Sequence, residues 1–167
     1  MSANKTFNVL FLCTGNSARS ILGEVLCEHL GEGRFNGFSA GSDPQGKVNP
    51  LALELLEELS ISRDGLRSKS WDEFAAPGAP KMDFVFTVCD NAAGEICPVW
   101  PGHPTTAHWG IADPASVAGD KTTRMQAFRT ARAELEQRIR AFQNLPLESL
   151  DSPALREQLQ RIGRGET

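Results

Sequence analysis

Cys13 and Arg19 are separated by five residues in a short Gly-containing segment, and Ser20 follows them. An apolar run precedes the cysteine and a helical pattern follows the arginine, so the segment joins a strand to a helix. Backbone N–H groups of such a loop converge on one point, where the helix dipole also favours negative charge. Arg19 adds a planar, two-pronged donor. We therefore expect a cradle for a tetrahedral oxyanion, formed by Thr14, Gly15, Asn16, Ser17, Ala18, Arg19 and Ser20.

Cys13 stands at the mouth of this cradle. The field that binds an anion also stabilises a thiolate, so we expect the Cys13 pKa to fall well below about 8.5. Ser20 is expected to donate a hydrogen bond to the thiolate, and Asn16 to hold the loop by bonding its own backbone. Alternatively, Cys13 is a buried apolar residue and Arg19 a solvated one. The order of strand, loop and helix favours a nucleophilic Cys13.

A possible proton donor lies in the pair Asp113-Pro114, which follows a Gly-containing stretch after a predicted strand. A carboxylic acid at this place can protonate an oxygen that leaves as hydroxide or alkoxide. Asp-Pro pairs also open turns. On these residues alone, general acid and turn residue both remain open.

Three further cysteines lie in the chain. Cys89 follows a predicted strand at the same sheet edge as Cys13, and Cys97 lies in the loop after it. Cys27 falls inside the first predicted helix, where we expect it to pack in the core. A zinc site is an alternative, but its ligands would lack the usual close cysteine pairs. Its candidate ligands are Cys89, Cys97, His103 and His108.

The elements that must position these residues alternate between strands and helices. Strands are predicted at residues 7–13, 35–40, 83–88 and 106–111. Helices are predicted at 18–31, from Pro50, at 121–143 and from Ser152, with fraying between Arg161 and Gly165. Such alternation implies a parallel sheet with helices on both faces. Ligands of these sheets bind beyond the carboxyl ends of the strands.

Composition narrows the classes further. A chain of 167 residues with 40% hydrophobic residues suits one core. We expect a catalytic domain at 1–145 and a C-terminal helical extension at 146–167. A net charge of −4 argues against a nucleic-acid or anionic-membrane surface. Without a signal peptide or spanning segment, a cytoplasmic protein is expected. Its four cysteines are expected to include reactive thiols or metal ligands rather than to form a static disulfide framework.

The Cys13–Ser20 segment resembles the active-site loop of the low-molecular-weight protein tyrosine phosphatase family, and in particular its thioredoxin-coupled arsenate reductase branch. The similarity runs from about Thr6 to Gln143. It implies an α/β fold with a four-stranded parallel sheet, oxyanion binding in the loop, and Asp113 as general acid. Tyrosine phosphatases of this scaffold carry an aromatic residue after Asp-Pro. This chain has Ala115 there and no tyrosine, which favours a reductase.

The resemblance also implies a sequence of events. Cys13 attacks arsenate, Cys89 attacks Cys13 and releases arsenite, and Cys97 then attacks Cys89. Three thiols within reach of one another can supply and relay the two electrons needed. The gap between Cys89 and Cys97 is longer than in the thioredoxin-coupled members, which leaves the last step and the reductant open. Thioredoxin, or glutaredoxin with glutathione, could serve as that external thiol reductant.

Phosphate and sulfate are expected as competing anions, and no cofactor is required. Potassium is a possible ligand, because the family's monovalent-cation site would use residues that match Asn16, Glu24 and Ser39. The resemblance assigns no residue around 70–72 as the remaining acidic ligand of that site. Two alternatives to arsenate reduction remain. One is hydrolysis of phosphomonoesters by the same loop, and the other is a non-catalytic module that binds oxyanions or a metal.

Overall fold

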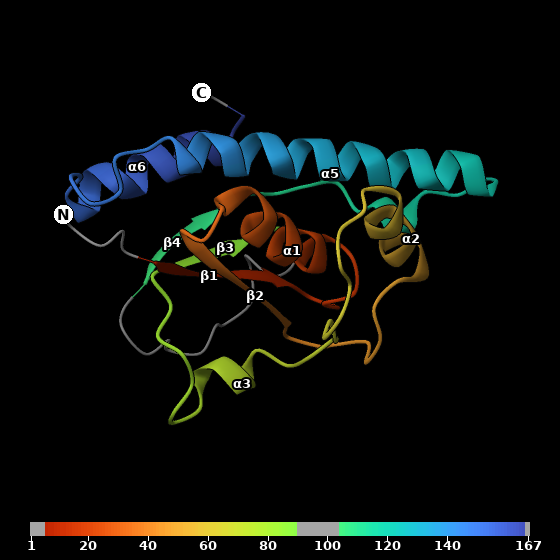
Figure 1. Ribbon diagram of the computed structural model, residues 1–167, viewed down its shortest axis with the longest axis horizontal. Helices are drawn as coiled ribbons and strands as arrows, with labels where there is room; N and C mark the ends of the chain where they lie inside the picture. Colours follow the sequence, from red (N-terminus) through yellow and green to blue (C-terminus); the bar gives the residue numbers. More distant parts are fainter. Residues whose placement is uncertain (1–5, 90–103, 166–167) are drawn as a thin grey trace.

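The computed structural model describes residues 6–89 and 104–165. In these residues a four-stranded sheet has the order β2-β1-β3-β4, and every neighbouring pair is parallel. The predicted parallel α/β sheet is confirmed (Figure 1). Its strands are β1 (Phe7–Cys13), β2 (Phe35–Gly41), β3 (Phe84–Thr87) and β4 (Thr105–His108).

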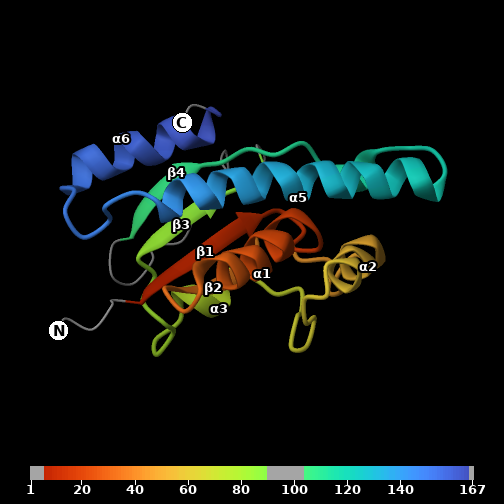
Figure 2. The ribbon, with the colours of Figure 1, turned by 45° about the horizontal axis from the view of Figure 1, so that its top comes forward.

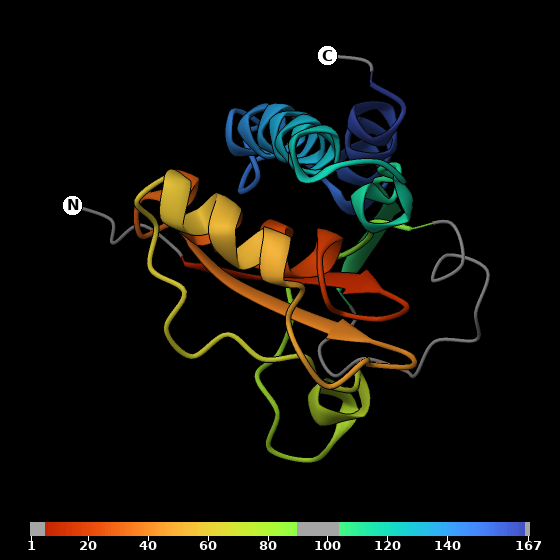
Figure 3. The same ribbon diagram turned by 90° about the vertical axis from the view of Figure 1, so that its right-hand side faces the viewer.

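Helices cover both faces of the sheet, but unequally. The longer helices lie on one face and the short α3 lies on the other, as the end-on view shows (Figure 3). No helix in the described part of the chain is both long and apolar enough to span a membrane. The helices are α1 (Arg19–Gly31), α2 (Pro50–Glu58), α3 (Asp72–Ala75), α5 (Lys121–Gln143) and α6 (Ser152–Gly163), with a 3-10 turn, η1, at Pro114–Ser116.

Strand β1 lies between β2 and β3, and its side chains alternate between two cores. Val9 and Phe11 belong to the large core, whereas Leu10 and Leu12 join the small core with Phe74 of α3. Helices α1 and α5 lie over the same face of the sheet (Figure 2). Both sets are buried because both faces are covered, which explains the continuous apolar run. The alternation carries Cys13, the last residue of β1, to the face of the large core.

The fourth strand is shorter than predicted. Regular pairing of β4 ends at His108, but two further backbone hydrogen bonds join the following residues to the end of β3 and the residue after it. Trp109 N donates to Thr87 O at 2.7 Å, and Ile111 N donates to Val88 O at 3.0 Å. These bonds carry the chain past the strand end, and from there it leads to Asp113.

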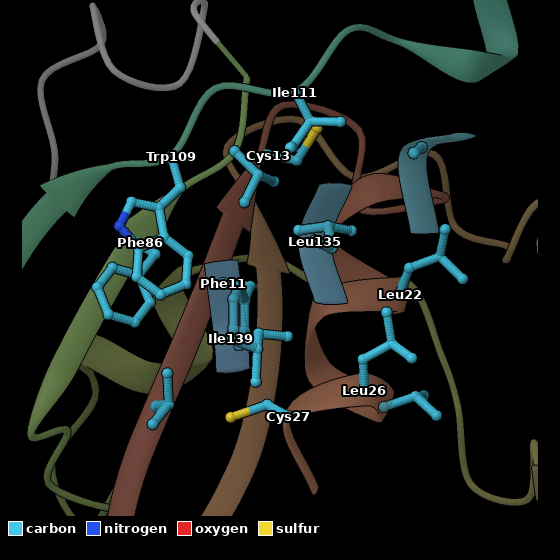
Figure 4. Packing of buried hydrophobic residues seen from close by; sticks show 14 of the residues in the cluster. Phe11, Cys13, Leu22, Leu26, Cys27, Phe86, Trp109, Ile111, Leu135 and Ile139 are labelled. Carbon is cyan, nitrogen blue, oxygen red and sulfur yellow. The ribbon is translucent and has the colours of Figure 1, made fainter. Parts of the chain in front are cut away.

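Helix α6 packs into the same core as the sheet. Its Leu155, Leu159 and Ile162 are buried, and the Trp109 indole N–H donates to the Leu159 carbonyl at 3.0 Å. The indole also stacks on Phe86, with ring centroids 3.7 Å apart; both rings are seen in Figure 4. The expected fraying from Arg161 is therefore wrong as far as Gly163, because Ile162 holds this end of the helix in the core.

The contact between α6 and β4 leaves no space for a side chain at Gly163. An added Cβ would lie 2.1 Å from the His108 carbonyl oxygen and 2.9 Å from Trp109. Alanine normally stabilises a helix by about 1 kcal/mol relative to glycine. Because the close neighbour is backbone, we expect Gly163→Ala instead to lower the free energy of unfolding by about 1–3 kcal/mol. Urea unfolding measures this change.

The exposed Gln160 on the same helix supplies the control. Gln160→Ala should change the unfolding free energy by no more than about 0.5 kcal/mol. A Gly163→Ala variant that is more stable than the wild type would contradict the tight packing of α6 on β4.

Candidate active site

The N-terminus of α1 differs from that of the other long helices. Helices α2, α5 and α6 are preceded by the N-cap residues Asn49, Asp120 and Asp151, and each of these side chains accepts a hydrogen bond from the first turn. Helix α1 begins after Ala18, which offers no such cap, and its first turn carries no acidic residue. The first N–H groups of a helix need acceptors. At α1 a bound anion can supply them.

The carbonyl groups of the loop are engaged on its outer side. Backbone N–H groups within residues 43–49 donate to three carbonyl groups of the loop, and the Ser68 hydroxyl adds a bond to Gly15 O at 3.2 Å. Because a trans peptide directs its C=O and N–H to opposite sides, these bonds leave the loop N–H groups turned towards the centre. The donors and acceptors are Asp43 N to Thr14 O (2.9 Å), Gln45 N to Gly15 O (2.9 Å) and Asn49 N to Ser17 O (2.8 Å).

Asn16 holds the turn of the loop from the inside. It is fully buried and has a φ of 45°, a left-handed conformation that asparagine adopts more easily than most residues. Its Nδ2 donates to Ser20 Oγ at 2.8 Å, and its Oδ1 accepts from Lys69 N at 2.8 Å. The expectation that Asn16 bonds its own backbone is therefore wrong. The partner is a segment 53 residues away in the chain.

Arg19 connects the loop with the segment that carries Asp113. Its Nη1 donates to Ile111 O at 2.9 Å, and its Nη2 lies 3.8 Å from Asp113 Oδ2. The Arg19 side chain is 15% exposed and that of Asp113 is 40% exposed. The Arg19 guanidinium and the Asp113 carboxylate thus lie close together at the edge of the loop.

Asp113 is a turn residue in this structure. Its Oδ1 accepts from Ala115 N at 3.0 Å and caps η1, so the turn interpretation is confirmed. The second oxygen, Oδ2, is the one that faces Arg19. One oxygen therefore fixes the turn while the other is directed to the loop, and the turn role does not compete with a role in proton transfer.

The structure brings Cys13 and Cys89 together. Both are buried free thiols, 6% and 3% exposed, and the Cys89 thiol lies close enough to Cys13 to affect its ionisation. Cys89 Sγ also lies 3.6 Å from Thr14 Oγ1 of the loop. Figure 4 shows Cys13 at the end of β1, beside Ile111. Cys97 lies outside the described residues, so its predicted place in a relay remains a prediction.

The second thiol changes the ionisation of Cys13. The hydrogen bond with Cys89 raises the pKa of Cys13 most, and burial raises it further. Arg19 and the Gly15 N–H lower it, as the sequence predicted, but the net direction is upward. The predicted depression of the Cys13 pKa is therefore wrong for the substrate-free site. Two thiols in contact titrate as a pair, and in the substrate-free site the contact with Cys89 disfavours the Cys13 thiolate.

The remaining cysteine and histidine ligand types are placed as follows. Cys27 is fully buried on α1 within the large core, which confirms its packing role (Figure 4). His108 Nδ1 forms a hydrogen bond of 2.8 Å with Thr87 Oγ1. Across residues 6–89 and 104–165, no three His, Cys, Asp or Glu side chains are grouped to hold a metal ion. Cys97 and His103 of the alternative zinc set lie outside these residues.

Lys69 is the residue at this site that sequence reasoning missed. It stands between two serines in a polar stretch, a pattern typical of an exposed loop. Its side chain is nevertheless only 8% exposed, and its backbone N–H holds Asn16. Asp72, the acidic residue within residues 70–72, is exposed at the start of α3.

Comparisons with known proteins agree with this geometry. An arsenate reductase of Shouchella clausii is 35% identical over 134 residues, which are 80% of this chain and 93% of that protein. The crystal structure of an arsenate reductase from Archaeoglobus fulgidus superposes with a TM-score of 0.64 at 26% identity, covering 82% of this chain and 99% of that one. A thioredoxin-dependent arsenate reductase of Corynebacterium glutamicum gives a TM-score of 0.58 at 26% identity.

The match to the Corynebacterium glutamicum protein covers 83% of this chain but only 61% of that longer one. Residues 8–159 match the family described as low molecular weight phosphotyrosine protein phosphatase. The match includes the Cys13 loop, the Asp113 turn and most of α6. The chain therefore belongs to the low molecular weight phosphotyrosine protein phosphatase family.

Proposed function

We propose that this chain reduces arsenate to arsenite, with Cys13 as the nucleophile and Cys89 as the thiol that resolves the adduct. The contact between these two buried thiols is the observation that supports the proposal most. Hydrolysis of a phosphate ester on this loop uses one thiol, whereas a two-electron reduction uses two. The relatives named arsenate reductases support the same function.

The first step forms a bond between sulfur and arsenic. Arsenate binds with its oxygens towards the loop N–H groups and Arg19, and the Cys13 thiolate attacks arsenic. One As–O bond breaks, and Asp113 gives its proton to the oxygen, which leaves as water. The Oδ2 of Asp113 suits this role because it is directed to the loop while Oδ1 holds the turn.

The second step transfers two electrons. The Cys89 thiolate attacks the Cys13 sulfur, and a Cys13 to Cys89 disulfide forms. The S–As bond breaks with its electron pair on arsenic, which is reduced from As(V) to As(III) and leaves as arsenite. Once Cys13 is bound to arsenic, the Cys89 thiol gives its proton to solvent and becomes the attacking thiolate. The contact between the two thiols in the resting site supports this direct attack.

The third step restores Cys13. The Cys97 thiolate attacks Cys89, a Cys89 to Cys97 disulfide forms, and Cys13 is released as a thiolate. A dithiol carrier of the thioredoxin class then reduces that disulfide; glutaredoxin with glutathione is the alternative. Such chemistry requires thiols to be kept reduced, so we propose the cytoplasm as its compartment.

The decisive experiment supplies arsenate or an aryl phosphate to pure protein without reductant and counts free thiols. Arsenate should consume two thiols per molecule of arsenite formed, while the aryl phosphate leaves the thiol count unchanged. Cys13→Ser should stay folded but form no arsenite and lose no thiols with arsenate, because the hydroxyl keeps the shape but is not ionised near neutral pH. Cys27→Ala, which changes a buried cysteine in the core, serves as the control and should react as the wild type does.

Release of phosphate from the aryl ester without thiol loss on arsenate would identify a phosphatase instead. If neither reaction occurs, the chain would be a module that only binds oxyanions. A Cys13→Ser variant that keeps more than a few per cent of the arsenate-dependent activity would remove Cys13 from the nucleophile role.

Asp113→Asn should separate the turn from the proton transfer. Asparagine keeps a side-chain oxygen for the cap of η1 but cannot give up a carboxylic proton. We expect kcat for arsenate to fall by about 100- to 10,000-fold, while calorimetry finds phosphate binding little changed. Asp120→Asn, at the matching cap of α5, is the control and should keep full activity. Unaltered turnover by Asp113→Asn would leave Asp113 as a turn residue only.

Cys97→Ser tests the end of the relay. Wild-type protein given one equivalent of arsenate and no reductant should end with a disulfide between Cys89 and Cys97. The variant should accumulate the disulfide between Cys13 and Cys89, because no third thiol remains to attack it. Peptide mapping under non-reducing conditions distinguishes the two products. Wild-type protein that ends with Cys13 bonded to Cys89 and Cys97 free would contradict the relay and indicate direct reduction by an outside thiol.

A further inference from the structure

Lys69 places a positive charge beneath the anion loop. Its side chain is 8% exposed, and its ammonium lies 3.6 Å from Glu24 Oε1 of α1 and 3.4 Å from Ser39 Oγ of β2. It also donates to Arg67 O at 2.9 Å. A buried charge is costly unless it is paired and hydrogen-bonded. These three contacts supply the pairing, so the ammonium is held in one place.

Glu24 and Ser39 are the side-chain partners of the Lys69 ammonium. Ser39 Oγ donates to Glu24 Oε1 at 2.6 Å, so a single carboxylate oxygen faces both the hydroxyl and the ammonium. Burial raises the pKa of Glu24, while Ser39 and Lys69 lower it. Burial likewise lowers the pKa of Lys69, and Glu24 raises it. Each group therefore offsets the desolvation of the other.

The backbone of the same residue reaches the loop. Lys69 N donates to Asn16 Oδ1 at 2.8 Å, and Lys69 O accepts from Gly41 N at 2.9 Å. The neighbouring Ser68 donates to Gly15 O. The ammonium thus fixes residue 69 against α1 and β2, and the N–H of residue 69 fixes Asn16 in the left-handed conformation that shapes the loop.

The residues that a monovalent-cation site would use are present, but their oxygens have other partners. Glu24 Oε1 and Ser39 Oγ contact the Lys69 ammonium, and Asn16 Oδ1 accepts the Lys69 N–H. Asp72, the acid near the expected fourth ligand, is exposed at the start of α3. A potassium ion placed among these oxygens would stand against the Lys69 ammonium, so the donor set does not fit the ion.

We propose that the Lys69 ammonium takes the place of a bound monovalent cation beneath the loop. Lys69 is then a positioning residue, which keeps the Cys13–Ser20 loop in its oxyanion-binding shape without added potassium. The inference rests on the proposed function only where arsenate turnover is the readout. Binding of inorganic phosphate reports on the loop whether or not the chain reduces arsenate.

The first measurement uses the wild-type protein in potassium chloride and in choline chloride at equal ionic strength. The Kd for inorganic phosphate, the KM for arsenate and the Tm should agree between the two salts, because no site for potassium is open. A specific gain in potassium would be seen as a higher Tm and tighter phosphate binding, since a ligand of the folded state stabilises it. That gain would overturn the proposal.

Two substitutions separate the effect of the Lys69 positive charge from the effect of the volume that its side chain fills. Lys69→Ala removes the ammonium and leaves room for an ion beside Glu24 and Ser39. In choline chloride it should bind phosphate at least about tenfold more weakly and show a raised arsenate KM, with a smaller change in kcat. Potassium chloride should restore binding and raise the Tm by linkage. Lys69→Met fills the space with an uncharged chain and should be impaired in both salts.

Lys121→Met is the control, because Lys121 forms an exposed ion pair with Glu54 at 2.7 Å on the surface. It should behave as the wild type in both salts. Wild-type phosphate affinity in both Lys69 variants, without a response to potassium, would overturn the positioning role. If neither variant folds, the comparison of salts on the wild type still decides the proposal. Phosphate binding without arsenite production would count against the proposed function and leave the Lys69 result intact.

Discussion

The direction of the peptide groups between Cys13 and Ser20 is the constraint on which the site depends. An anion can be held only if several N–H groups point to one centre, and this requires their carbonyls to be satisfied elsewhere. Backbone N–H groups within residues 43–49 and the Ser68 hydroxyl donate hydrogen bonds to these carbonyls. Asn16 turns the chain from the inside at a φ of 45°, and the buried bonds of its amide group offset the strain of that conformation.

This loop is fixed at its two ends by ordinary packing. Strand β1 is central and buried on both faces, which sets the place of Cys13, while α1 begins without a side-chain cap, which leaves its first N–H groups for a ligand. The Cys89 thiol then adds a second condition. In the resting site its contact raises the pKa of Cys13. The same contact keeps the second sulfur beside the first for the proposed electron transfer.

The elements and the loop were predictable because their signals are local. The apolar run before Cys13, the glycine-containing turn and the helical spacing after Arg19 lie within a few residues of one another. The partners of Asn16 and Arg19 were not predictable, since they lie 53 and 92 residues away in the chain. Burial of Lys69 was hidden for a different reason: its polar neighbours indicate a surface loop, and only the folded sheet brings Glu24 and Ser39 to it. The end of α6 was misjudged because its composition does not reveal the contact with β4.

A cation that belongs to the chain differs physically from one that must be bound. A free ion gives up its freedom of movement and part of its hydration each time it binds, and its occupancy follows its concentration. The Lys69 ammonium incurs the cost of desolvation once, during folding, and Glu24 offsets part of it. In the proposed arrangement the conformation of the loop therefore depends on the stability of the fold and not on the concentration of a free cation. The loop should then keep its shape wherever α1, β2 and the segment at Lys69 stay packed together.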